Sequence, residues 1–330
     1  MSVGVDKNRE PREGPLVSES TGYLLLAGGL VALPWLIPNY QRVFAAEILV
    51  WGLFALSFAI VYGVGGMLSF AQAVFFGMGC WGFNFAIYYL QLNTWGAVAV
   101  AIIAAMLLAI PTGFLATRAR QHHFLIVTVI ISVLVHTVLA SGHYRWIAGS
   151  YVTRAMTFVP EVPLGFTAFS FGNEFVSYYF TLALVAVAIL AAWLIVNSPF
   201  GKALRAVRDN EMRSALIGLN VNRLRFLMFV AATAFAGLSG ALYALIARYT
   251  DLEFFHWTYS GKAVVLAVVG GVHSLVGPFF GTAFYMIASE HLSQYFEQFT
   301  IVFGVILLIV IRYAPEGLWG LIVRQTALRR

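Results

Sequence analysis

The residue patterns that could support catalysis are weak in this sequence. Two Gly-Lys pairs, Gly201-Lys202 and Gly261-Lys262, lack the earlier glycine that a phosphate-binding loop requires. The segment 237–240 has the GxSG spacing of a serine nucleophile, which would need a histidine facing the serine. His273 falls in a predicted hairpin and His291 at a predicted helix end, so intramembrane hydrolysis is kept only as a remote alternative.

Metal and cofactor chemistry is not indicated by the spacing of possible ligands. The histidines include the adjacent pair His122 and His123, whose side chains diverge on a helix. The single cysteine, Cys80, lies in an apolar stretch, which argues against a disulfide framework and a cysteine-based metal site. We therefore expect no metal ion and no cofactor on this chain.

The composition indicates a protein embedded in a lipid bilayer. Hydrophobic residues make up 61% of the 330 residues, and charged residues only 10%. A soluble protein could not keep so much apolar surface from water, and the same composition excludes disorder, coiled coils and nucleic-acid modules. The net charge of +6 is therefore interpreted as loop charge, and we expect no nucleic-acid partner.

Long apolar segments predict an all-α polytopic membrane protein. A helix needs about 20 mostly apolar residues to cross the hydrocarbon core of a bilayer. We expect about 8–10 transmembrane helices, some broken or re-entrant, in a domain spanning residues 22–313. Flexible cytoplasmic tails are expected at 1–21 and 314–330. The predicted segments are 22–38, 44–63, 74–91, 95–116, 124–141, 177–197, 224–247, 262–272, 276–291 and 299–313.

Basic charge in the loops predicts the orientation. The connection 198–223 is rich in Lys and Arg, whereas the loop 142–176 carries only Arg145 and Arg154. Short loops rich in Lys and Arg stay in the cytoplasm. We therefore expect 198–223 and both termini to be cytoplasmic, 142–176 to be periplasmic, and the chain to span a bacterial inner membrane.

The cytoplasmic loop 198–223 has the pattern of a short amphipathic helix. Leu204, Val207 and Ala215 recur at near-helical spacing, with charged residues between them. A solvated connector with no further role is the alternative interpretation.

Several motifs of this chain resemble one family of transport proteins. The run from Gly201 to Glu211, GKALRAVRDNE, resembles the cytoplasmic loop of permease subunits in the branched-chain amino acid family of ABC importers, which includes urea and amide transporters. The other matching segments, which follow the family's order along the chain, are 62–81, 229–245, 266–284 and 312–320.

The resemblance implies a role for the cytoplasmic loop and a set of partners. In this family a short coupling helix docks on an ATP-hydrolysing subunit and transmits its closure to the permease. The implied partners are a second homologous permease subunit, two ATP-binding subunits that carry ATP and Mg²⁺, a periplasmic solute-binding protein and membrane lipid. The residues expected to couple to the ATPase are Arg205, Arg208, Asp209, Glu211 and Gly218.

Two similar interruptions divide the apolar segments. GGMLSFAQAVFFG (65–77) and GGVHSLVGPFFG (270–281) each open with a glycine pair and close on Phe-Phe-Gly. Paired helix breaks can line a transport pathway, while small residues can also simply allow helices to pack closely. Both interpretations stay open. The candidate pathway residues are Ser69, Gln72, Asn84, Gly65, Gly66, Gly270, Gly271 and Ser274.

The expected function is that of a permease subunit of an ATP-driven importer. Its solute is expected to be small and polar or zwitterionic, a hydrophobic amino acid first, with urea or a short amide as the alternative. A secondary transporter is the alternative of another class. Such a transporter usually needs carboxylates deep within the helix bundle to bind protons or sodium. The one candidate here is Glu47, which lies near the end of its predicted helix. The loop 142–176 keeps only Gly149 and Ser150 of the family's pattern there, which leaves the solute open.

Overall fold

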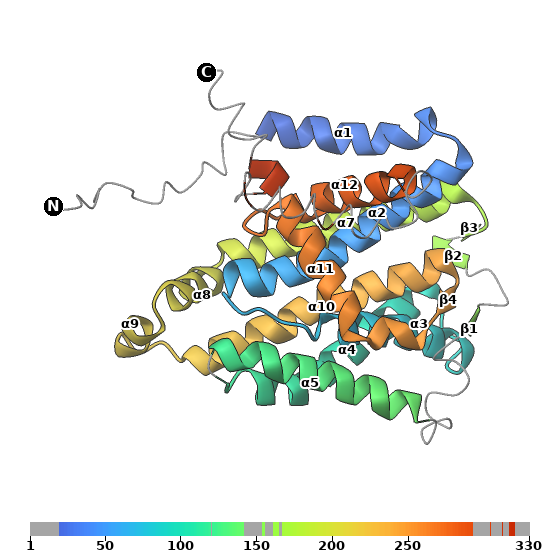
Figure 1. Ribbon diagram of the computed structural model, residues 1–330. Helices are drawn as coiled ribbons and strands as arrows, with labels where there is room; N and C mark the ends of the chain where they lie inside the picture. The colour runs from blue at the N-terminus through green and yellow to red at the C-terminus, as the bar shows by residue number, and fades with distance from the viewer. Residues whose placement is uncertain are drawn as a thin grey trace.

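The computed structural model describes residues 20–119, 121–141, 154–155, 161–164, 167–292, 304, 312 and 317–320. Within these residues, long helices run side by side along one axis, which confirms the all-α prediction (Figure 1). Most of the predicted segment 299–313 and most of both predicted tails lie outside the described residues.

The helices follow the predicted segments closely, and most of them begin a few residues earlier. Helix α2 continues directly into the short π-helix η1, and the chain then leaves helical geometry before α3. The bounds are α1 Ser20–Leu36, α2 Asn39–Ala59, η1 Ile60–Val64, α3 Gln72–Tyr88, α4 Thr94–Ala116, α5 Gln121–Ala140, α7 Glu174–Asn197, α8 Pro199–Asp209, α9 Glu211–Leu216, α10 Val221–Ala247, η3 Leu252–Phe255, α11 Trp257–Gly270 and α12 Gly277–Leu292.

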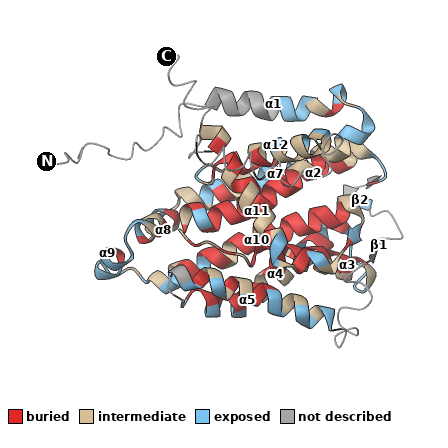
Figure 2. Ribbon diagram, in the orientation of Figure 1, coloured by how far each residue is buried: buried red, intermediate tan, exposed pale blue. Residues whose placement is uncertain are grey.

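Five of the described helices are long and apolar enough to cross a membrane. In α2 with η1, and in α10, 72% of the most apolar stretch is buried inside the bundle. In α4, α5 and α7 that share is only 22–33%, so these helices leave most of their apolar surface for lipid. Figure 2 shows the buried residues gathered on the central helices and exposed stripes on α5. The helices α1, α3, α11 and α12 are shorter, as broken or re-entrant segments would be.

Small residues allow α3 and α10 to pack with their backbones almost in contact. A Cβ on Gly240 would overlap the carbonyl oxygen of Phe76, and one on Gly79 would overlap the carbonyl oxygen of Gly237. The thiol of Cys80 donates to the carbonyl of Gly240 at 3.1 Å. Close approach through small residues is a common way to join membrane helices, because the apolar side chains gain nothing by leaving lipid.

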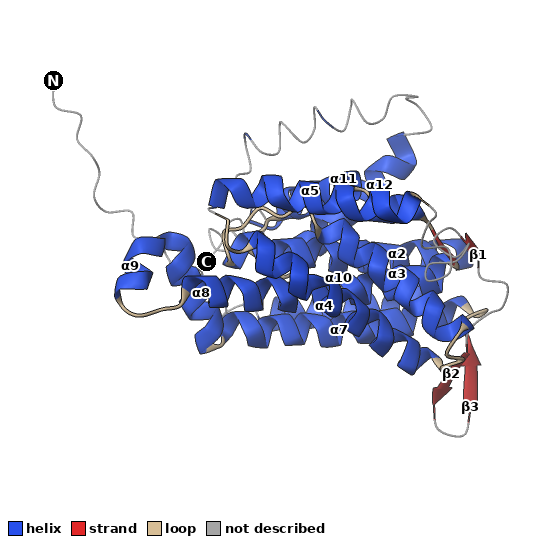
Figure 3. Cartoon of the chain, turned by 90° about the horizontal axis from the view of Figure 1, so that it is seen from below, coloured by secondary structure: helices blue, strands red, loops and turns tan. Residues whose placement is uncertain are grey.

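The two ends of the bundle carry different structures. The short helices α8 and α9 project from one end, and the strands lie at the other (Figures 1 and 3). The strands, which the sequence pattern did not predict, form two small antiparallel pairs. They are β1 Arg154–Ala155 with β4 Tyr249–Thr250, and β2 Glu161–Leu164 with β3 Thr167–Ser170.

Candidate functional site

The first predicted interruption is a true break in the helix. After η1, residues 65–71 are not helical, and Gly66 has a φ of 68°, a left-handed conformation that favours glycine. Helix α3 then begins at Gln72. A π-helix next to a break often marks a functional position in a helix.

The backbone groups released by this break are satisfied by neighbouring helices. The amide of Phe70 donates to Thr128 Oγ1 of α5 at 3.1 Å, and the hydroxyl of Ser260 in α11 donates to the carbonyl of Phe70 at 2.7 Å. The amide of Ala73 donates to the same Ser260 hydroxyl at 2.9 Å. Thr128 and Ser260 were not among the predicted site residues, although a hydroxyl within an apolar helix is a recognisable signal.

The second interruption is also a break, and its serine has a structural role. Helix α11 ends at Gly270, and Gly271 has a φ of 112°, which again favours glycine. The hydroxyl of Ser274 accepts from the amides of Val276 at 3.3 Å and Gly277 at 3.2 Å, where α12 begins. Ser274 thus satisfies amides that the start of a helix leaves without partners.

The two interruptions and the C-terminal motif meet at one place. A Cβ on Gly63 would overlap the carbonyl oxygen of Val272. Gly317, with a φ of 75°, lies so close to Gly271 that no side chain fits between them. We call residues 63–66, 270–272 and 317 the glycine junction. Three motifs that lie far apart in the sequence therefore pack together here through their glycine backbones.

The remaining candidate pathway residues occupy two separate places. Ser69 is buried and accepts from the amide of Ala71 at 3.3 Å. Gln72, at the start of α3, is fully buried, and its Nε2 has no hydrogen-bond partner among the described residues. Asn84 donates to Thr250 Oγ1 at 3.0 Å at the strand-bearing end. Gln72 and Asn84 lie about 18 Å apart along α3 at 1.5 Å per residue, so they do not form one site.

The predicted coupling helix is two helices rather than one. Helix α8 ends at Asp209, and α9 begins at Glu211. The residue between them, Asn210, has an extended backbone, and its side chain accepts from the amide of Arg213 at 2.9 Å. Asn210 therefore caps the second helix, and this cap explains why the amphipathic pattern does not continue as one helix.

Two of the residues expected to face an ATPase are engaged within the chain. Arg208 donates to the carbonyl of Gly63, inside the glycine junction. Glu211 accepts two hydrogen bonds from the buried Arg225 of α10, at 3.0 and 2.8 Å. Asp209 is mostly exposed, Arg205 is partly exposed, and Gly218 has a φ of 89° in an exposed turn.

Helix α9 and the turn after it expose apolar side chains that were not among the predicted coupling residues. Met212, Leu216 and Ile217 are 77%, 83% and 71% exposed. Helix α9 itself lies at the end of the molecule, beyond the bundle (Figure 1). We call these three residues the α9 patch. Exposed apolar residues grouped beyond the bundle indicate a surface for another protein.

The Glu211–Arg225 pair is expected to fix α9 against α10. Changing Glu211 to Gln should lower the unfolding free energy by about 1–2 kcal/mol, because Arg225 would lose a charged acceptor while remaining buried. Thermal denaturation in detergent measures this change. Asp209→Asn is the control, since its exposed pairing with Arg208 should contribute almost nothing. Equal melting temperatures for Glu211→Gln and the wild type would show that the pair does not hold the loop.

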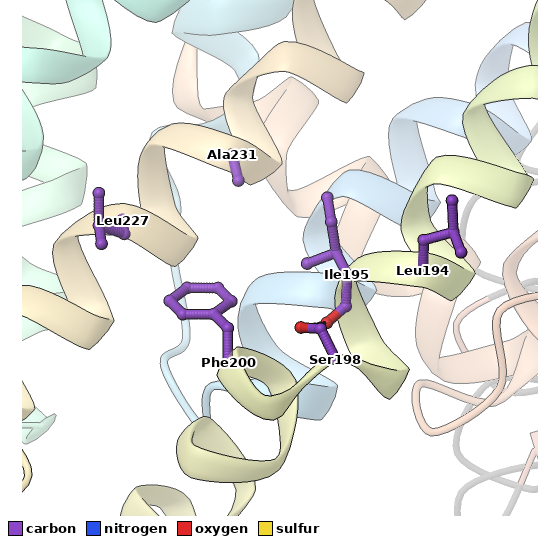
Figure 4. Close-up of a pocket in the computed structure, with 6 residues that line it drawn as sticks. All are labelled: Leu194, Ile195, Ser198, Phe200, Leu227 and Ala231. Carbon is purple, nitrogen blue, oxygen red and sulfur yellow. Dashed lines mark hydrogen bonds between the residues drawn. The ribbon is translucent and has the colours of Figure 1, made fainter.

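The pocket drawn in Figure 4 does not suit a polar solute. It has a volume of about 440 Å³ and lies where α7, α8 and α10 meet. Its one polar side chain, Ser198, donates to the carbonyl of Ile195 at 2.6 Å. Leu194 and Leu227 of its lining are half exposed. None of the six lining residues of this pocket belongs to the glycine junction.

The family model described as "Branched-chain amino acid transport system / permease component" matches residues 43–311. The chain belongs to this permease family. The match contains both interruptions and the whole of α8 and α9. It also confirms the resemblance carried by the motifs and makes this protein the permease subunit of an ABC importer, a multi-pass membrane protein.

Curated relatives of this permease agree with the family assignment. The high-affinity branched-chain amino acid transport permease LivM of Escherichia coli K12 is 21% identical over 330 residues, covering 93% of this chain and 76% of the relative. LivH of Salmonella typhimurium is 26% identical over 288 residues, covering 82% of this chain and 91% of the relative. The guanosine ABC transporter permease NupQ of Bacillus subtilis is 28% identical over 115 residues, or 34% of this chain and 35% of the relative. No solved structure matches the chain.

Proposed function

We propose that this permease forms an inner-membrane importer with a second permease subunit, two ATP-binding subunits and a periplasmic solute-binding protein. The observation that best supports the ATP-binding partner is the α9 patch, which lies in the basic loop 198–223 and beyond the end of the bundle. Basic loops stay in the cytoplasm, where ATP is available. The relatives LivM and LivH are both named as permeases of one kind of transport system, which supports the second permease partner.

The proposed solute is a hydrophobic amino acid. This choice follows from the relatives LivM and LivH, which are named as branched-chain amino acid permeases and whose matches cover most of the chain. Urea and short amides are the second candidates because of the family resemblance. The match to the guanosine permease NupQ covers a smaller part of the chain, so a nucleoside serves as a competitor in the test.

The solute pathway is proposed to pass the glycine junction and Gln72. Gln72 is buried next to the first break, and its amide nitrogen can donate to a passing solute, because no described residue accepts from it. The alternative enzymatic use of the GxSG segment finds no support, since the Ser239 hydroxyl donates to the carbonyl of Val50 at 2.8 Å inside the bundle. Ser239 thereby joins α10 to α2.

The proposed function predicts ATP-dependent uptake only by the complete assembly. Vesicles holding both permeases and both ATP-binding subunits, with the binding protein outside and ATP inside, should accumulate radiolabelled leucine. Excess unlabelled leucine should block this uptake, while urea or guanosine should not. Vesicles with this chain alone should show no uphill uptake. Uphill uptake by this chain alone, without ATP, would instead identify a secondary transporter.

A further inference from the structure

We propose that the guanidinium of Arg208 links the coupling helices to the glycine junction and carries movement of the cytoplasmic loop into the membrane domain. This inference rests on the proposed function, in which an ATP-binding subunit moves that loop. Arg208 was expected to contact the partner, but its side chain is directed at the membrane domain instead.

The link has two parts on the Arg208 side chain. Its guanidinium donates to the carbonyl of Gly63 in η1, the π-helix that follows α2. Its aliphatic carbons lie against Gly66, where a Cβ would come within 2.6 Å of Cγ. Only glycine, with its left-handed backbone, permits this approach. The contact thus fixes both the position and the direction of the side chain.

The link continues from Gly63 to the second interruption. Gly63 packs directly on the backbone of Val272, and the next residue back, Gly271, packs on Gly317. These contacts join backbone to backbone, so a displacement at Gly63 cannot be absorbed by a side chain changing rotamer. A rigid series of packed groups can pass movement between two sites.

Asp209 provides the outward half of the link. Its carboxylate lies 3.2 Å from Arg208 Nε, and its side chain is 67% exposed, against 30% for Arg208. The same turn of α8 therefore presents one charge to the junction and the opposite charge to solvent. A partner that binds Asp209 and moves it would also pull on the paired Arg208 guanidinium, which holds Gly63. Movement of the loop would thereby be transmitted directly to the helix break.

Arg208→Met tests the link, because it keeps the aliphatic stem against Gly66 and removes every donor. In the complete importer, we expect leucine accumulated per ATP hydrolysed to fall about tenfold while ATP hydrolysis continues, a coupling loss of the size expected for such a series. Arg208→Lys retains a cationic donor and should give an intermediate ratio. Lys202→Met, an exposed change on the same helix, is the matched control and should leave the ratio unchanged.

An unchanged ratio in Arg208→Met, or a parallel loss of hydrolysis and uptake in an intact complex, would overturn the proposal. If Arg208→Met does not assemble, the Arg208→Lys ratio decides, and a wild-type value there would also overturn it. Hydrogen exchange on this chain alone provides a readout that needs no transport. Arg208→Met should speed amide exchange at 63–66 and 270–272, and Lys202→Met should not. If the wild-type importer fails to accumulate leucine, the proposed function is wrong, and hydrogen exchange still decides whether the link exists.

Discussion

Changing Leu216 and Ile217 together to aspartate is expected to abolish copurification of an ATP-binding subunit with this permease. Both side chains belong to the α9 patch and are more than two-thirds exposed in the isolated chain. Full burial of one such side chain contributes about 1.5–3 kcal/mol, so losing two should weaken the complex at least about a hundredfold. Neither residue packs into the bundle core, so membrane insertion should not change.

The control for this experiment keeps the patch apolar. Leu216→Met with Ile217→Val should retain the partner, because side chains of similar size and polarity replace the originals. Affinity purification of tagged permease from cells expressing all the subunits measures the bound ATP-binding subunit. Wild-type recovery of that subunit with the double aspartate variant would rule out the α9 patch as its docking surface.

Gly240→Ala is expected to destabilise the bundle more than a single methyl group usually does. The added Cβ would overlap the carbonyl oxygen of Phe76 and lie 2.9 Å from the amide nitrogen of Cys80. Because both are backbone atoms, α3 and α10 must move apart to relieve the overlap. A cost of about 3 kcal/mol is expected, at the upper end of the usual range for overpacking.

Gly261→Ala is the matched control for this change. Gly261 is also helical, but its added Cβ would meet only the ring of Phe70, at an ordinary 3.8 Å. Replacing a helical glycine with alanine there should be neutral or stabilise by about 0.5–1 kcal/mol. The apparent melting temperature of detergent-purified protein separates the two variants. Equal melting temperatures would mean that α3 and α10 tolerate a wider separation.

The sequence alone determined the class of the protein and the positions of most of its helices. Long apolar segments can be recognised without tertiary information, because the bilayer requires each span to satisfy its own backbone. The two similar glycine-containing motifs at 65–77 and 270–281 also located both helix breaks, since glycine is unfavourable inside a helix. The motifs around Gly201–Glu211 and the two breaks also indicated the family.

Tertiary structure alone decided which candidate residues work together. Nothing in the spacing shows that Arg208 reaches Gly63, that Glu211 pairs with Arg225, or that Gln72 and Asn84 lie far apart. The two pairings join residues that are 145 and 14 positions apart. The distance between two residues along the chain does not show whether they pack together. A charged residue on an amphipathic helix can face either a partner or its own bundle. Which of the two Arg208 faces depends on how α8 packs against η1, and only the folded chain determines that packing.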